Sequence, residues 1–303
     1  MADQRNRRGP HTTRRRSLLQ GLAVAAGGCL PWVASTAAPR PSRWKIERPA
    51  IGAIGLRYQG SVIAQKAQAH GELAALCDVD RHVREQARAA FGSTAAIFED
   101  YREMLARKQI DVVLIGTPDH WHAKMLIDAC RAGMDVYCEK PLANSVLEGR
   151  AMVTAANRAG KIIQCGSQER STESVRLACE QARNGKLGKL HTVEVHLPTD
   201  ESHHLKVIAQ KEIAPVMPVP EGFDYDGWLG FTPWRPFRPF MPDEPNRGCH
   251  FWWRFNLLYG GGEMTDRGAH IIDLAQLALG KDDTGPVSIT AQGRRANVGL
   301  FDA

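Results

Sequence analysis

The 303-residue sequence contains no apolar run of about 18 residues, so beyond its N-terminus we predict no transmembrane helix. It also contains no internal repeat and no long linker. Hydrophobic residues make up 43% and charged residues 24%, proportions that exclude a disordered or collagen-like chain. A globular chain of this length typically has about two domains.

Excess charge is almost absent outside the first 38 residues. The chain has 39 Lys+Arg against 33 Asp+Glu, a formal net charge of +6. Residues 1–38 contain six arginines and one acid, Asp3, so they contribute +5 and leave +1 for the rest. Because the basic excess lies in the leader and not on a folded face, we expect no nucleic-acid partner.

The leader has the three-part layout of a secretory signal. Arg14, Arg15 and Arg16 precede a short apolar run at residues 18–30, and small residues follow at 35–38. This layout resembles a twin-arginine signal peptide over residues 1–38, which implies export to the periplasm by the twin-arginine machinery after folding. The alternatives are a basic disordered tail and, as a minor possibility, lipid anchoring at Cys29.

Closely paired cysteines are absent from the rest of the chain. Several of the six that remain after Cys29 fall in apolar runs, so we interpret them as core thiols and not as a disulfide framework. These six are Cys77, Cys130, Cys138, Cys165, Cys179 and Cys249.

From about residue 50, short apolar strands alternate with helical stretches, a pattern typical of a doubly wound parallel sheet. We therefore predict an α/β Rossmann domain at residues 48–165. The predicted strands are residues 50–54, 73–77, 111–115, 136–138 and 162–165, and the predicted helices are residues 60–69, 81–91, 120–131 and 145–160.

After Gly166 the pattern changes, and we predict an α+β domain at residues 166–303 with an open, mostly antiparallel sheet. Residues 190–197 alternate like a strand with one wet face, residues 264–279 have helical periodicity, and a strand begins at 287–292. Because the sequence stops soon afterwards, we expect this domain to be incomplete and its apolar edge to lower solubility. A complete sheet would favour a homo-oligomer.

A glycine turn follows the first predicted strand. Dinucleotide binding requires a tight turn that presents backbone N–H groups to the pyrophosphate, and an acid after the next strand that holds the ribose. Arg57 replaces the middle glycine, and it either crowds the pyrophosphate or binds it; the plain alternative is an ordinary strand–helix turn. Asp78 favours NAD, while nearby Arg81 leaves NADP as the lesser option. The predicted cofactor residues here are Gly55, Arg57, Tyr58, Gln59, Gly60 and Asp78.

Two further motifs follow the third and fourth main strands, where ligands bind in parallel sheets. They are Gly116-Thr117-Pro118-Asp119-His120-Trp121-His122 and Cys138-Glu139-Lys140-Pro141. We assign Thr117, Pro118, His120, His122, Glu139 and Lys140 to the cofactor crevice. The two histidines would otherwise be a surface pair or metal ligands; since no acidic or cysteine cluster accompanies them, we expect no metal.

Asp266, His270 and Asp273 are spaced i, i+4 and i+7, so a helix would place them on one face. A carboxylate beside an imidazole raises the pKa of the histidine and fixes its ring, which suits a general base. The alternative is a polar surface stripe.

Together these motifs resemble the glucose–fructose oxidoreductase / inositol dehydrogenase (Gfo/Idh/MocA) family over residues 50 to about 292. The resemblance implies a nicotinamide-binding Rossmann domain and a second domain, and activity on carbinol carbons of sugars and cyclitols. It also implies Lys140, Asp266 and His270 as catalytic residues. Gln168 and Arg170 match a loop near the substrate, and we assign Asp273 to the substrate with them.

The chemistry implied is oxidation of a CH–OH group. His270 would accept the hydroxyl proton, Asp266 would orient the imidazole, and Lys140 would stabilise alkoxide charge. An exported enzyme has no free nicotinamide pool, so we expect a tightly bound cofactor. Two alternatives remain: a redox-neutral, NAD-dependent glycoside-cleaving enzyme of the same fold, and a non-catalytic sugar-binding relative. Trp228, Trp234, Trp252 and Trp253 either stack on a sugar or form core.

Overall fold

The computed structural model describes residues 48–92, 94–197, 204–210, 212–293 and 299–301. The predicted leader, with Cys29, lies outside these residues. The chain from residue 47 onwards forms one compact unit. No helix within the described ranges combines the length and the apolar character that crossing a membrane requires.

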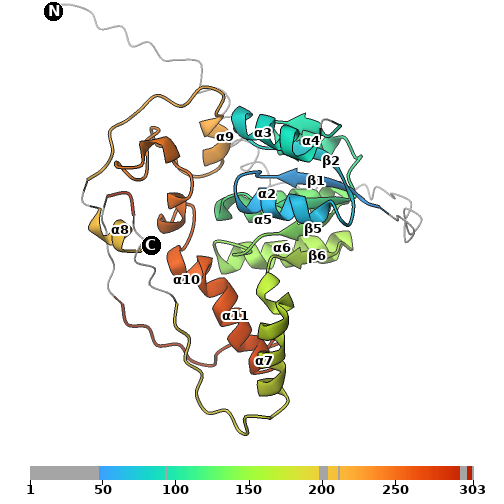
Figure 1. Cartoon of the computed structure of the whole chain (residues 1–303), viewed down its shortest axis with the longest axis vertical. Helices are drawn as coiled ribbons and strands as arrows, with labels where there is room; N and C mark the ends of the chain where they lie inside the picture. Colours follow the sequence, from blue (N-terminus) through green and yellow to red (C-terminus); the bar gives the residue numbers. More distant parts are fainter. Residues whose placement is uncertain (1–47, 93, 198–203, 211, 294–298, 302–303) are drawn as a thin grey trace, which may run out of the picture. The chain divides into compact units, whose positions relative to one another are not determined.

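A parallel sheet of six strands, in the order β3-β2-β1-β4-β5-β6, confirms the predicted doubly wound fold (Figure 1). β1 and β4 are neighbours at the centre, where the strand order reverses, and ligands of such sheets bind beyond the carboxyl ends at this point. The strands are β1 (Ala50–Ile54), β2 (Glu72–Cys77), β3 (Ala96–Phe98), β4 (Val112–Ile115), β5 (Asp135–Cys138) and β6 (Ile163–Cys165).

Helices cover both faces of this sheet, and each face has its own core cluster. Ala53 of β1 belongs to the cluster that contains Ile63 of α2 and Val83 of α3. Its neighbour Ile54 points to the other face and packs in the cluster of α4, α5 and α6. These helices are α2 (Gln59–Ala67), α3 (Arg81–Phe91), α4 (Tyr101–Ala106), α5 (Asp119–Ala132) and α6 (Val146–Ala159).

The helix ends follow from local chemistry. The side chain of Ser145 accepts from Glu148 N and the Glu148 side chain accepts from Ser145 N, which is the predicted capping box at the start of α6. Asp80 caps α3 by accepting from His82 N at 2.9 Å. α6 ends at Gly160, whose φ of 61° is the left-handed conformation that glycine adopts most easily.

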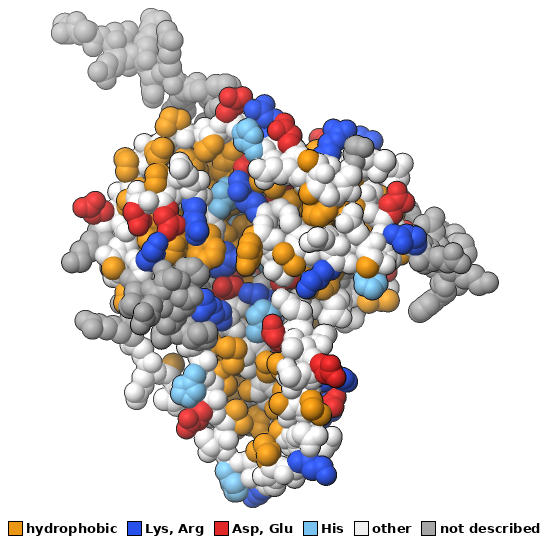
Figure 2. Space-filling view, viewed as in Figure 1, with side chains coloured by type: hydrophobic (Ala, Val, Ile, Leu, Met, Phe, Trp, Pro, Cys, Tyr) orange, Lys and Arg blue, Asp and Glu red, His pale blue; other side chains and the backbone are white. Residues whose placement is uncertain are grey.

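The remaining residues form short helices and 3₁₀ turns joined by irregular segments, and some of them pack in an aromatic cluster. α11 packs along α7, and Leu177 of α7, Ile272 of α11 and Leu279 just after α11 have exposed side chains. Figure 2 shows hydrophobic side chains gathered at this lower end of the molecule. The elements are α7 (Glu173–Arg183), α8 (His204–Ala209), α9 (Tyr225–Leu229), α10 (Gly262–Asp266), α11 (Gly268–Ala278), and the 3₁₀ turns η2 (Gln168–Ser171), η3 (Pro245–Arg247) and η4 (Trp252–Phe255).

Two predicted strands in this part are wrong. Residues 190–197 and 287–292 have no strand structure, and every strand in the described ranges belongs to the Rossmann sheet. Their apolar side chains are exposed, including Val193 and Val287. A strand forms only beside a partner that completes its backbone hydrogen bonds, and no described segment pairs with either stretch.

The predicted helix at 264–279 is two helices, α10 and α11, which meet at Arg267. Gly268 follows the break, and glycine is the weakest helix former after proline.

The tryptophans divide between core and surface. Trp228, Trp252 and Trp253 are buried in the aromatic cluster, which confirms the core interpretation for these three. Trp234 remains 54% exposed.

Candidate active site

The predicted glycine turn closes tightly against the end of β4. Gly55 has a φ of 78°, and its N–H donates to Cys77 O at 2.9 Å. A Cβ atom on Gly60 would lie 1.7 Å from Gly55 O, and one on Gly116 would lie 2.7 Å from Gly60 Cα. These contacts exclude any side chain and bring the start of α2 to the central crevice.

Arg57 does not project freely from this turn. Its Nη2 lies 2.5 Å from Asp80 Oδ2, so the guanidinium links the glycine turn to the loop after β2. Tyr58, the N-cap residue of α2, has a φ of 36° and is 82% exposed. Gln59 Nε2 donates to Glu139 Oε1 at 3.1 Å, which ties the turn to the loop after β5.

Asp78 lies at the end of β2, where an acid would meet the ribose. Its carboxylate accepts from Leu56 N at 2.8 Å and from Asp80 N at 2.9 Å. Burial raises the pKa of Asp78, although both backbone bonds oppose that shift. Arg81, the predicted NADP alternative, binds Glu221 at 3.0 Å. Asp78 therefore disfavours a 2′-phosphate here, whereas the charge of Asp80 is paired with Arg57.

This region fits a bound dinucleotide. The turn leaves no room for side chains at Gly55 and Gly60, as close approach of a pyrophosphate requires. Thr117 Oγ1 is buried and has no hydrogen-bond partner in the described part of the chain, so it is available to a ligand atom. Pro118, beside it, is the N-cap residue of α5.

The two histidines assigned to the cofactor are deeply buried. His122 contacts Pro141 O at 2.7 Å through Nδ1 and Thr117 O at 2.9 Å through Nε2, so it joins the loops after β4 and β5. Burial lowers its pKa. His120 contacts Trp228 O at 3.0 Å, and burial lowers its pKa to about 4. Among the described residues, no group of three potential metal ligands is present.

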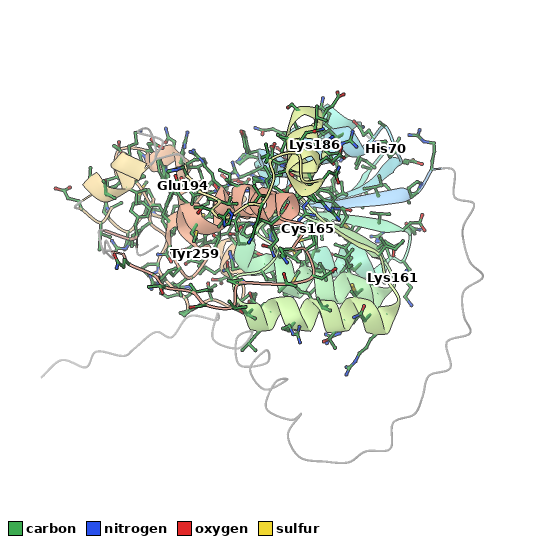
Figure 3. The ribbon with its side chains drawn as sticks, turned by 90° about the horizontal axis from the view of Figure 1, so that it is seen from below. His70, Lys161, Cys165, Lys186, Glu194 and Tyr259 are labelled. Carbon is green, nitrogen blue, oxygen red and sulfur yellow. The ribbon has the colours of Figure 1, made fainter. Side chains whose placement is uncertain are left out.

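Lys140 and Asp266 are in direct contact. Lys140 Nζ donates to Asp266 Oδ1 at 2.6 Å and to Asp266 O at 3.0 Å. The preceding Glu139 is buried, and its Oε2 accepts from Lys140 N at 3.1 Å. Figure 3 shows the direction of the strands, which run from the edge marked by His70 and Lys161 towards Cys165.

Two charged residues beside Asp266 were not predicted from the sequence. Arg254 Nε lies 3.5 Å from Asp266 Oδ1. Burial opposes ionisation of Asp266, but Arg254 and Lys140 together hold its pKa below the usual value. Asp119, at the start of α5, is buried, and burial raises its pKa well above the usual value, against the opposing charge of Arg254.

His270 differs from the prediction in its electrostatics. Its pKa is lowered, first by burial and then by the ammonium of Lys140, whereas we expected a carboxylate to raise it. Within the described residues no hydrogen bond joins His270 to Asp266, whose carboxylate is held by the two cations. His270 Nδ1 is buried, and no described residue forms a hydrogen bond with it. A neutral imidazole of this kind can accept a proton.

The three residues assigned to the substrate have different surroundings. Arg170 binds Asp273 through two contacts of 2.6 Å and binds Asp282 at 2.9 Å, so its guanidinium clamps α11 to η2. These hydrogen bonds raise the pKa of Arg170. Gln168 Oε1 is buried and has no partner among the described residues. Of the three, Gln168 alone has a buried polar atom that still needs a partner.

Fold and site together define a dinucleotide-binding protein of the Rossmann class, with an ammonium, an imidazole and a carboxylate beyond the carboxyl ends of its strands. Residues 50–167 match the sequence pattern described as "Oxidoreductase family, NAD-binding Rossmann fold", and residues 173–299 match "Oxidoreductase family, C-terminal alpha/beta domain". The chain therefore belongs to the Gfo/Idh/MocA oxidoreductase family, as the motifs predicted, and NAD is its cofactor.

Curated relatives carry two kinds of name. The alpha-N-acetylgalactosaminidase of Shewanella oneidensis is 31% identical over 205 residues, which are 59% of this chain and 45% of that protein. The D-glucoside 3-dehydrogenase of Escherichia coli is 32% identical over 209 residues, 69% of this chain and 47% of that protein. The chain thus spans less than half the length of either relative.

A solved structure shares the architecture. The crystal structure of an oxidoreductase domain protein from Kribbella flavida superposes with a TM-score of 0.56 at 26% identity, covering 78% of this chain and 55% of that one.

Proposed function

We propose that the protein oxidises a carbinol carbon of a sugar or cyclitol, with NAD held tightly in the Rossmann domain. The observation that carries this proposal is the contact of 2.6 Å between Lys140 Nζ and Asp266 Oδ1, at the carboxyl ends of the strands that form the NAD domain. The name of the D-glucoside 3-dehydrogenase supports a sugar substrate.

The residues that would hold the dinucleotide are the backbone of the turn from Gly55 to Gly60, the Asp78 carboxylate and the Thr117 hydroxyl. The chemistry supplied by bound NAD is acceptance of a hydride from the carbinol carbon. Asp78 favours NAD over NADP by repelling a 2′-phosphate.

The proton of the substrate hydroxyl goes to a ring nitrogen of His270. Its lowered pKa keeps the imidazole neutral at pH 7 and open to a proton. Lys140 donates a hydrogen bond to the substrate oxygen and so stabilises the negative charge that develops there. Asp266 orients Lys140 by holding two of its donors. This differs from the sequence prediction, in which Asp266 oriented the histidine.

A second candidate function is redox-neutral cleavage of a glycoside. The observation that favours it is the name of the Shewanella relative, an alpha-N-acetylgalactosaminidase. The same three side chains would serve, because oxidation and later re-reduction of one carbon move the same proton. The two functions differ in product: net oxidation gives a keto sugar, whereas cleavage gives a free sugar with no redox change.

We also propose export. The arginines at 14–16 and the small residues at 35–38 support a twin-arginine signal, so the cofactor would be loaded before transport. Cell fractionation tests this: the protein should accompany periplasmic markers, and replacing the three arginines with lysine should retain it in the cytoplasm. Unchanged fractionation of that variant would reject the signal.

The experiment that tests the function begins with the purified protein. Denaturation should release NAD, identified by absorbance and by mass, and a panel of sugars and cyclitols should then reveal a keto product or a cleaved glycoside. His270→Ala should abolish turnover and retain NAD. Absence of released nucleotide, together with sugar binding, would instead support the non-catalytic alternative.

A further inference from the structure

Arg254 of η4 occupies a fixed position between aromatic rings. Its guanidinium carbon lies 4.5 Å from the ring centre of Trp253 and 5.1 Å from that of Phe251. Nη1 also donates to Phe251 O at 3.0 Å. These contacts come from its own segment and do not involve Asp266.

The same guanidinium shares a carboxylate with the candidate catalytic lysine. Arg254 Nε lies 3.5 Å from Asp266 Oδ1, the oxygen that Lys140 Nζ contacts at 2.6 Å. The side chains of Arg254 and Asp266 are only 21% and 24% exposed, so water screens this contact weakly. Two cations from different elements thus neutralise one carboxylate.

We propose that Arg254 is a positioning residue that keeps Asp266 ionised, so that Lys140 is not needed for this purpose and can direct a donor to the substrate oxygen. The consequence for catalysis rests on the proposed function; the effect on Asp266 does not.

The reason lies in the number of donors and charges around Asp266. Lys140 has three N–H donors and places two of them on Asp266. A buried carboxylate that loses its cation is strongly destabilised. Without Arg254, Lys140 alone would oppose burial, and its ammonium would be drawn more firmly to the carboxylate.

The other titratable groups around Asp266 do not replace Arg254. Asp119 of α5 is itself a carboxyl group, so it cannot stabilise the negative charge of Asp266. Each of these two carboxyl groups disfavours ionisation of the other. His270 of α11 is neutral when it acts as a base. The lowered pKa of Asp266 agrees with the geometry, because the charges of Arg254 and Lys140 both oppose the effect of burial.

The test measures ionisation of Asp266 directly. Aspartate carboxyl carbons are labelled with ¹³C in the full chain, and Asp266→Asn identifies the signal of Asp266. Arg254→Gln should raise the titration midpoint of Asp266 by about one pH unit or more, whereas Arg254→Lys, which keeps the charge, should leave it near the wild-type value.

Arg247→Gln is the matched control. Arg247 also stacks on Phe251, at 5.0 Å, but it binds Glu244 at 3.2 Å and belongs to η3. Its loss should not move the titration of Asp266. If Arg254→Gln and Arg247→Gln both titrate like the wild type, the proposal is overturned.

Turnover gives the second measurement. Arg254→Gln should lower kcat at least tenfold with unchanged NAD content, and Arg254→Lys should restore most of it. If the titration moves as expected but the wild type turns over no sugar, the role of Arg254 at Asp266 stands and the proposed function fails. Full activity of Arg254→Gln would reject the consequence for catalysis.

Discussion

Lys140 Nζ contacts Asp266 Oδ1 at 2.6 Å, although 126 residues separate them in the sequence. The contact joins the loop after β5 to the end of α10. The lysine is therefore placed by the Rossmann sheet and oriented by a residue of the second family match. Neither part of the chain contains the candidate catalytic pair alone.

Replacing Lys140 with methionine should lower turnover by about 100- to 1,000-fold, because one donor to the developing alkoxide is removed. NAD content, measured after denaturation, should stay unchanged, since the glycine turn is intact. Lys161→Met is the control: Lys161 lies at the opposite end of the sheet, 3.7 Å from Asp135 (Figure 3). Wild-type turnover of Lys140→Met would contradict the assignment.

The acid side of the pH–rate profile should reflect His270. The imidazole must be neutral to accept a proton, and burial with Lys140 lowers its pKa. Activity should therefore persist below the ordinary histidine value of about 6.5 and fall only as the pH drops through the lowered pKa. Steady-state rates between pH 4 and 8 measure this. A midpoint above 6.5 would contradict the electrostatics of the site.

Gly60→Ala should disrupt the cofactor turn. The new Cβ would lie 1.7 Å from Gly55 O, so α2 must move away from β1. We expect a loss of about 1–3 kcal/mol in the free energy of unfolding and a marked loss of bound NAD. Gly149→Ala, in α6 with nothing within 4 Å of the new Cβ, should instead be neutral or stabilising by up to about 1 kcal/mol. Equal NAD content in both variants would argue against the turn as the binding site.

The free energy of unfolding should decrease as the pH is lowered from 7 to 5, because of His120. Its pKa is lowered to about 4 in the folded chain, while an unfolded histidine titrates near 6.5. The neutral form is thus favoured by folding; this contribution is complete above about pH 6.5 and is lost as the pH falls towards 4. We expect about 2 kcal/mol to be lost by pH 5.

Urea unfolding at pH 7 and pH 5 measures this effect. His120→Gln should reduce the difference between the two values. His70→Gln, an exposed control, should keep the wild-type difference. Identical pH dependence in all three proteins would exclude His120 as its source.

The sheet was predictable because each strand and helix has its own periodicity. The capping box at Ser145 and the glycine stop at Gly160 depend on neighbours within a few residues, so the sequence contains all the information. β3 has three residues, too few for a period, and was missed. In residues 190–197 apolar and polar side chains alternate as they do in a strand. This alternation does not supply the partner strand that such a segment needs.

The sequence motifs pointed to Lys140, Asp266 and His270, but the electrostatics around these residues could not be predicted from their spacing. Spacing alone placed Asp266 beside His270, whereas the structure turns that carboxylate towards Lys140 and Arg254. Burial then reverses the expected shift in the pKa of His270. The sequence indicates a role for Arg254 only weakly, as an arginine among aromatic residues just before the glycine run at 260–262. Its spacing from Asp266 does not predict that the two side chains meet.

His122 has a consequence for engineering. Its two ring nitrogens contact carbonyl oxygens on separate loops, those of Thr117 and Pro141. Burial lowers the pKa of His122, so the neutral ring has a single N–H and donates to only one of these oxygens, while it packs against both segments. A loop exchange that replaced only the segment around Pro141 would therefore change the surroundings of this buried ring. We therefore expect an exchange of both segments together to disturb the fold less than an exchange of either one alone.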